Sequence, residues 1–214
     1  GNTYEFTFKF FRDCTGASAP TSVPLCVYNL CTNTNIATPY LQRIVGNIPG
    51  TSTPNGSPTS TGCPGFQTSC QSPSSPVEGY AEWWYRGTYT LPTPGASCDQ
   101  WRFNTYIGAR NPSTNITGSY FYVEAYLNRK PVATAPPINN NSPTFANAPI
   151  PYYCANQPNT FNNGTVEADG DSLSFSSITP FNQFGCTHTA ATTCTYTNAG
   201  YNPTSNPFNT GNSF

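Results

Sequence analysis

Tyr4-Glu5-Phe6-Thr7-Phe8-Lys9-Phe10 carries the clearest structural signal in this chain. Aromatic side chains occupy every second position, and charged or hydroxyl side chains fill the positions between them. Successive side chains of a β-strand point to opposite faces, so the pattern predicts a strand with one buried face over residues 4–11. Similar runs at 83–91, 101–107 and 119–127 are separated by turns rich in proline and glycine. The sequence therefore predicts an all-β fold.

The organisation of the chain changes near residue 135. Residues 130–143 are rich in proline and asparagine and show no core periodicity, as expected of a linker. We therefore expect two tandem β-sandwich domains, immunoglobulin-like in type, at 1–135 and 143–214. The second has fewer strand-like runs, so it is either incomplete or completed by a neighbouring chain. Those runs are 150–154, 165–167, 172–178 and 194–196.

Composition excludes several classes of partner. Lys and Arg total 8 against 9 Asp and Glu, so the chain has no basic field for binding nucleic acid. No apolar run is long enough to predict a transmembrane helix. No signal-like segment is visible at Gly1, and we expect any secretion signal to have been removed or to lie outside this sequence.

Nine cysteines beside one histidine and no methionine predict disulfides, and hence an extracellular or cell-surface protein. The pairing is open, but short loops favour Cys26–Cys31, Cys63–Cys70 and Cys186–Cys194, leaving Cys14–Cys98. The Cys63–Cys70 bridge would pin the Gly-, Ser- and Pro-rich loop at 45–78. Cys154 then lacks a partner, which predicts a partner beyond Phe214, an intermolecular bridge or a buried thiol.

One face of the run at 119–127 carries tyrosines. Phe121, Val123, Ala125 and Leu127 would face the core, and Tyr120, Tyr122 and Tyr126 the opposite side. The tyrosines are interpreted either as ordinary cross-strand packing covered by a loop, or as a contact surface for a subunit or ligand.

Several short motifs follow one another along the chain: Phe10-Phe11-Arg12-Asp13-Cys14-Thr15-Gly16, Tyr89-Thr90-Leu91-Pro92, Trp101, Arg110-Asn111, Tyr122-Val123-Glu124-Ala125 and Leu127-Asn128. In this order they resemble the N-terminal region of large secreted surface proteins of Bacteroidota, which often carry polycystic-kidney-type or cadherin-like domains. The resemblance implies export by the type IX route, display on the outer surface and no catalytic activity. Family members often have two cysteines where this chain has Gly108-Ala109, so their disulfide pattern does not carry over there.

The second part resembles a cadherin-like repeat. Asn139-Asn140-Asn141-Ser142-Pro143-Thr144-Phe145 is similar to the linker between such repeats. Glu167, Asp169 and Asp171 supply hard oxygen ligands that suit Ca²⁺, and Asn139 and Asn141 could complete the shell. The alternative is an acidic β-turn before a strand, where Asp and Gly are favoured by local hydrogen bonding.

Catalytic motifs are absent from the sequence. His188 stands alone without a nucleophile motif, and no spacing supports a pair among the carboxylates Glu82, Glu124, Asp13 and Asp99. We therefore do not expect an enzyme. Four Asn-x-Ser/Thr sequons, at Asn55, Asn115, Asn140 and Asn163, are compatible with surface loops.

The sequence thus predicts a structural or adhesive surface protein, a segment or subunit of an extracellular filament or adhesin. Its expected partners are further copies of itself or neighbouring domains of the same surface protein. The alternative is a carbohydrate-binding module that uses exposed aromatic side chains, including either Trp83 or Trp84, to stack on sugar rings. Because adjacent strand residues face opposite sides, only one of these two tryptophans could join such a platform.

Overall fold

The computed structural model describes residues 2–60, 65–93, 99–111, 116–129, 141–148, 152, 162, 164–176, 178–186 and 192–196. All regular elements in this part of the chain are strands, and they pair antiparallel. Within the same residues, no helix is long and apolar enough to cross a membrane. The all-β prediction is confirmed.

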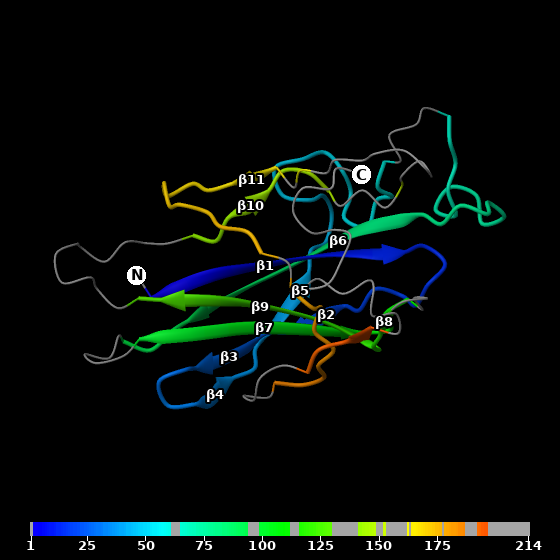
Figure 1. Cartoon of the computed structure of the whole chain (residues 1–214). Coiled ribbons are helices and arrows are strands. Elements are labelled where there is room, and N and C mark those ends of the chain that lie inside the picture. Colours follow the sequence, from blue (N-terminus) through cyan, green and yellow to red (C-terminus); the bar gives the residue numbers. More distant parts are fainter. Residues whose placement is uncertain are drawn as a thin grey trace.

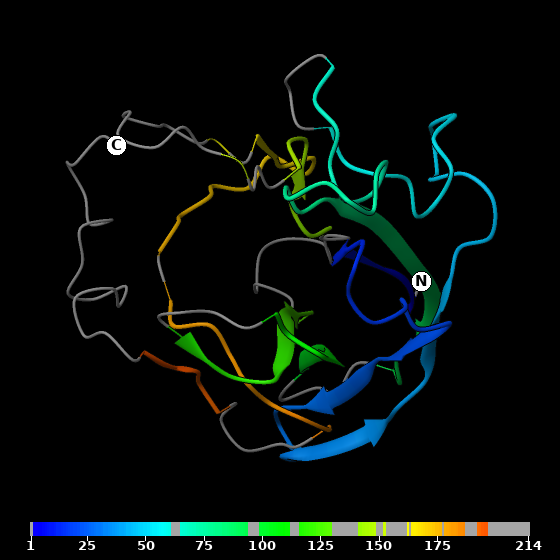
Figure 2. The same cartoon turned by 90° about the vertical axis from the view of Figure 1, so that its right-hand side faces the viewer.

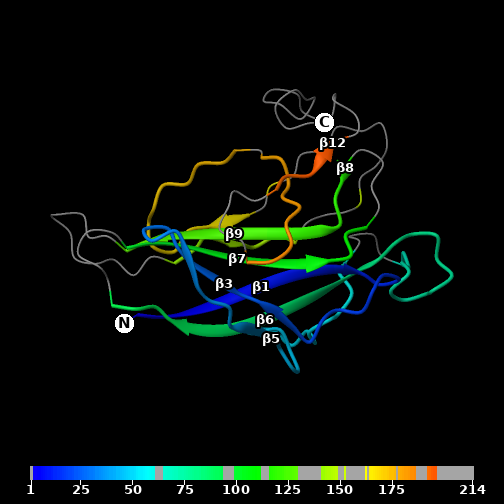
Figure 3. The same ribbon diagram turned by 90° about the horizontal axis from the view of Figure 1, so that it is seen from below.

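Two four-stranded sheets form the body of the molecule (Figures 1 and 3). The first sheet has the order β1-β6-β5-β2, and the second has the order β4-β3-β7-β9. Two further pairs, β8–β12 and β10–β11, are short. In the first sheet the strands are β1 (Thr3–Asp13), β2 (Ser22–Pro24), β5 (Tyr40–Arg43) and β6 (Tyr80–Thr90). In the second they are β3 (Cys26–Asn29), β4 (Thr34–Ala37), β7 (Gln100–Gly108) and β9 (Tyr120–Asn128). The short strands are β8 (Ile116–Thr117), β10 (Thr144–Phe145), β11 (Thr165–Val166) and β12 (Thr195–Tyr196).

The core lies between the two sheets. The rings of Phe6 on β1 and Phe103 on β7 meet across it, with centroids 4.7 Å apart. The aromatic face of β1 packs against this core and its odd-numbered face is exposed over Thr3–Lys9, as the alternation predicted. Such a face-to-face arrangement buries apolar surface from both sheets, which is the main favourable term in folding. The buried cluster consists of Val23, Leu25, Val27, Leu41, Tyr85, Leu91, Trp101 and Phe103.

The four strongly patterned strands and two of the weaker ones are present in the structure. The runs at 4–11, 83–91, 101–107 and 119–127 correspond to β1, β6, β7 and β9, and those at 165–167 and 194–196 to β11 and β12. A strand at 172–178 is wrong for its described residues, which are irregular and leave Phe175 71% exposed. The run at 150–154 lies outside the described residues except for Tyr152.

The C-terminal segment, meaning residues 178–186 and 192–196, packs against the second sheet, on the side remote from β6 (Figures 2 and 3). Strand β12 pairs with β8, and Phe181 bridges Tyr122 of β9 to Thr193. The side chain of Asn182 accepts hydrogen bonds from the backbone N–H groups of Ser119 and Tyr120. Most of the linker lies outside the described residues, so the two-domain division and the immunoglobulin-like tandem stay predictions.

Two disulfides join positions that are distant in the sequence. Cys14, just after β1, is bonded to Cys70, and Cys26 of β3 is bonded to Cys186 of the C-terminal segment. Their sequence separations are 56 and 160 residues. Closing loops of this length restricts the unfolded chain strongly, so both bonds stabilise the fold.

These bonds show that all four predicted pairings are wrong. Cys14–Cys98 and Cys63–Cys70 fail because Cys14 and Cys70 take each other, and Cys31 is bonded to a cysteine other than Cys26. Cys186–Cys194 fails because Cys186 takes Cys26, leaving Cys194 buried and unbonded. Short loops misled the prediction because strand pairing brings distant segments together: the Cys14 N–H donates to the Gly79 carbonyl beside the end of the loop. Cys63, Cys98 and Cys154 lie outside the described residues.

Candidate functional site

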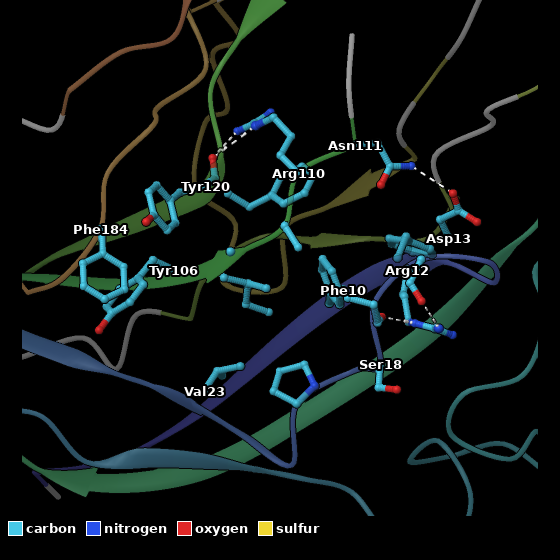
Figure 4. Close-up of a pocket in the computed structure, with 18 of the residues that line it drawn as sticks. Phe10, Arg12, Asp13, Ser18, Val23, Tyr106, Arg110, Asn111, Tyr120 and Phe184 are labelled. Carbon is cyan, nitrogen blue, oxygen red and sulfur yellow. Dashed lines mark hydrogen bonds between the residues drawn. The ribbon is translucent and has the colours of Figure 1, made fainter.

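A pocket of about 620 Å³ lies at one end of the two sheets (Figure 4). The end of β1, the following loop and β2 contribute one side of it. The end of β7 and the start of β9 contribute the other, together with Phe184 of the C-terminal segment. We call this cavity the end pocket. Its volume falls in the range of natural ligand sites, about 300–1,000 Å³.

Seven aromatic side chains line the end pocket. The rings of Phe10 and Phe121 meet edge to face with centroids 6.0 Å apart. Phe184 lies against Tyr106 at 5.0 Å and against Tyr120 at 5.2 Å. Packing at these distances holds the rings in fixed orientations. Aliphatic and proline side chains complete the walls: Val23, Ile107, Ile116, Pro20 and Pro24.

Arg12 shapes the loop that borders the end pocket. Its guanidinium donates to the backbone carbonyls of Gly16, at 2.6 Å, and Ala17. Arginine is suited to this role because its rigid fork presents several donors at once. Arg12 therefore fixes the path of the chain between β1 and β2.

Asp13 joins the two sheets at the rim of the pocket. Its Oδ1 accepts hydrogen bonds from the backbone N–H and the hydroxyl of Thr15, both at 2.8 Å. Its Oδ2 accepts a hydrogen bond from the side-chain amide of Asn111, at 3.1 Å. The fold thus brings together the two segments singled out by sequence, 10–16 and Arg110-Asn111. Asp13 and Asn111 lie 98 positions apart in the sequence.

Arg110 ties the C-terminal segment to the pocket wall. Its guanidinium donates to the carbonyls of Tyr120, at 2.7 Å, and Phe181, at 3.1 Å. It also lies 4.2 Å from the ring centroid of Phe121, a cation–π distance. The preceding Ala109 has φ +63°, a left-handed conformation that is unfavourable for alanine and ends β7 at this point.

Two phenols at the pocket are held in their neutral form. Burial raises the pKa of Tyr106 above its ordinary value, with a smaller contribution from Tyr40. Burial also raises the pKa of Tyr80, and the nearby carboxylates of Glu78 and Asp13 add to the effect. A phenol with a raised pKa does not act as a base near neutral pH.

The end pocket combines apolar and aromatic side chains with three charged side chains. Arg12, Asp13 and Arg110 are all engaged by other groups of the chain. The walls offer apolar and aromatic surface, which favours an apolar or aromatic group of a ligand.

The tyrosine face of β9 is partly covered from within the chain. Tyr122 is 5% exposed and meets the ring of Phe181 at 5.6 Å, and Tyr120 packs on Phe184. The C-terminal segment covers Tyr122, as the loop-coverage interpretation expected, whereas Tyr120 is half-buried and lines the end pocket. Tyr126 remains 61% exposed and donates to Glu124.

The residues predicted to bind calcium form a hydrogen-bonded turn. Asn141 donates to Asp169 from its backbone N–H and its side-chain amide. The backbone N–H groups of Asp169 and Asp171 both donate to Glu167, at 2.8 Å. These hydrogen bonds join Glu167, Asp169, Asp171 and Asn141 in one turn, and within the described residues no group of three or more acidic, His or Cys side chains is placed to hold a metal ion. Asn139 lies outside the described residues. Calcium at this turn stays a prediction.

The two tryptophans of β6 point to opposite sides, as alternation predicted. Trp83 packs against the core beneath Arg43 and Gly56. Trp84 faces outward, where Lys9 lies 4.2 Å from its ring centroid. The indole N–H of Trp84 donates a hydrogen bond to Glu82. Neither ring is an open platform for a sugar.

The carboxylates considered for catalysis have separate partners. Glu82 binds Trp84, Asp13 binds Thr15 and Asn111, and Asp99 forms an ion pair with Arg129 at 2.8 Å. Glu124 lies 4.0 Å from Arg102 on the second sheet. His188 lies outside the described residues.

The sequence did not identify Val23, Tyr106 or Phe184 as site residues. Tyr106 belongs to the predicted strand at 101–107. The end of that strand lies beside β2 because of the way the two sheets are arranged, and the sequence does not reveal this arrangement. Phe184 reaches the pocket through the Cys26–Cys186 disulfide, which spacing did not reveal. The resemblance motifs around Arg12 and Arg110, and Tyr120 of the tyrosine face, indicated this end of the molecule.

Comparison with known proteins yields no relative. No protein-family model, curated protein or solved structure matches the chain.

Proposed function

We propose that the chain is an extracellular structural or adhesive module of a cell-surface protein that binds a partner macromolecule through the end pocket. The partner would insert an apolar or aromatic group between the two sheets. The disulfides support an oxidising location outside the cell, where such bonds form and persist.

The engagement of the pocket's charged groups carries this proposal. Arg12 and Arg110 donate to backbone carbonyls, and Asp13 accepts from Thr15 and Asn111. A general acid or base must reach its substrate with a group that can exchange a proton. Charges committed to the fold instead preorganise a rigid apolar recess, which lowers the entropic cost of binding.

The resemblance to secreted surface proteins of Bacteroidota points the same way. Its two most distinctive motifs, Phe10–Gly16 and Arg110-Asn111, supply the rim and part of the wall of the end pocket. In this proposal those motifs build a binding site at one end of the module, and the disulfide-linked sheets hold that site rigid.

Filling the end pocket tests the proposal. Ser18 lines the pocket from an exposed loop, so Ser18→Trp should place an indole in the cavity with little effect on stability. Thr21→Trp is the matched control, because Thr21 is exposed on the same loop and does not line the pocket. Beads coated with the wild type or with either variant would be tested for binding to intact cells of the source organism. In a separate experiment, an antibody to this protein and a gold label would show whether the protein lies on the surface of those cells.

We expect gold on the outer surface, and several-fold weaker bead retention for Ser18→Trp than for the wild type or Thr21→Trp. Equal retention of all three proteins would overturn the role of the end pocket. Absence of surface label would overturn the proposed location.

A further inference from the structure

Strand β1 forms one border of the first sheet and spans 11 residues. On one side it pairs with β6 along its whole length, from Thr3 opposite Thr90 to Asp13 opposite Tyr80. On its other side no described residue pairs with it (Figure 1). An edge of this length presents a row of unpaired backbone groups that another strand could join.

The hydrogen bonds at both ends of β1 show which backbone groups face that free edge. The Leu91 N–H donates to the Asn2 carbonyl, and the Cys14 N–H donates to the Gly79 carbonyl, both at 2.9 Å. Even-numbered residues therefore bond toward β6. Because the direction alternates along a strand, the N–H and C=O groups of the odd-numbered residues point to the free edge. These residues are Thr3, Glu5, Thr7, Lys9 and Phe11.

The charges on β1 are arranged symmetrically about Thr7. Glu5 precedes it by two residues and Lys9 follows it by two, and both side chains are on the exposed face. We propose that a second copy of this chain adds to the edge of β1, antiparallel and with Thr7 opposite Thr7. Each Glu5 then lies opposite Lys9 of the other copy, in the hydrogen-bonded pairs that the backbone directions require.

The same register matches the inner face of the strand. Aromatic side chains meet aromatic side chains across the two-fold axis, so the core of one copy would continue toward the core of the other. The inner pairs are Tyr4 with Phe10 and Phe6 with Phe8.

Other arrangements are disfavoured by charge. Parallel pairing in register would place Glu5 beside Glu5 and Lys9 beside Lys9, and like charges directly opposite each other are destabilising. A lysine on an edge strand normally discourages pairing with foreign strands. Within one copy Lys9 lies over the Trp84 ring and Glu5 contacts Arg86. A second β1 gives each of these charges a further, opposite partner, which selects a second copy over an arbitrary strand.

Charge exchange at positions 5 and 9 tests this interface by sedimentation equilibrium over a range of concentrations. We expect the wild type to dimerise, and Glu5→Lys or Lys9→Glu alone to weaken the dimer by at least about tenfold in Kd. The double variant Glu5→Lys/Lys9→Glu should restore the dimer, because the exchanged charges again face each other. A mixture of the two single variants should also associate.

Backbone pairing is tested separately at Thr7. Thr7→Pro removes an outward N–H while leaving the bonds to β6, which use even-numbered residues, so it should abolish the dimer. Thr7→Ala keeps the N–H and should not. Circular dichroism checks that each variant is folded.

A protein that stays monomeric at every concentration would overturn the inference, as would a dimer that ignores these substitutions or is not restored by charge exchange. The result is independent of the end pocket, because Ser18→Trp leaves positions 5, 7 and 9 unchanged.

Discussion

Asn55 shows how one polar side chain can replace part of a β-ladder. Its amide nitrogen donates to the carbonyls of Ile44, at 2.8 Å, and Trp84, at 3.0 Å. Its side-chain oxygen accepts a hydrogen bond from the backbone N–H of Trp84 at 2.7 Å. The next residue, Gly56, has φ +93° and lies so close to the Trp83 ring that a Cβ there would fall 2.5 Å from it. Asn55-Gly56 therefore fixes the long loop onto β6.

We predict that Asn55→Ala lowers the free energy of unfolding by about 2–3 kcal/mol, because it leaves partly buried backbone groups without partners. Urea denaturation measures the change. Ser57→Ala is the control: it destroys the same sequon but leaves all three hydrogen bonds, and it should be nearly neutral. Equal destabilisation by both substitutions would show that the sequon, and not the side-chain bridge, matters.

At the scale of elements, the end of the sandwich away from the end pocket is closed by an ion pair. Arg129 follows β9 and Asp99 precedes β7, and their side chains are only 8% and 2% exposed. Asp99 also accepts the Trp101 N–H at 2.6 Å, and Arg129 donates to the Pro92 carbonyl at 2.9 Å. The pair thus locks the β7–β9 ends to the segment that follows β6.

Removing one partner of this pair should be costly, since it leaves a buried charge without compensation. We predict that Arg129→Ala lowers the free energy of unfolding by about 3–5 kcal/mol. Glu5→Gln breaks the exposed Glu5–Arg86 contact and should cost less than about 1 kcal/mol. Guanidinium denaturation of both variants gives the comparison. A loss at Arg129→Ala as small as that at Glu5→Gln would contradict the proposed lock.

How far the elements could be predicted from sequence depended on their length. In β1, five aromatic residues within eight positions predict one buried face, and this prediction can be made without knowing the tertiary structure. The short strands β2 to β5 have three or four residues each, too few for a period to be visible, and Pro24 argues against a strand. They form because longer neighbours supply the hydrogen-bonding partners.

For the whole molecule, the features that could not be predicted from the sequence, the end pocket and the disulfides, are those that depend on long-range contacts. The motifs around Arg12 and Arg110 both lie at the end pocket, so the sequence singled out part of its lining. The pocket itself forms only when the two sheets face each other. The disulfides failed for the same reason: Cys26 and Cys186 are 160 residues apart in sequence and 5.3 Å apart between their Cα atoms. Spacing along the chain contains no information about that contact.

The disulfide map of protein isolated from its natural source tests both the fold and the extracellular location. Free thiols would be alkylated on extraction, and the protein digested without reduction and analysed by mass spectrometry. We predict peptides linked through Cys14–Cys70 and Cys26–Cys186, with Cys194 alkylated only after unfolding. Alkylated Cys14, Cys26, Cys70 and Cys186 in the native protein would contradict this disulfide pattern and the proposed extracellular location.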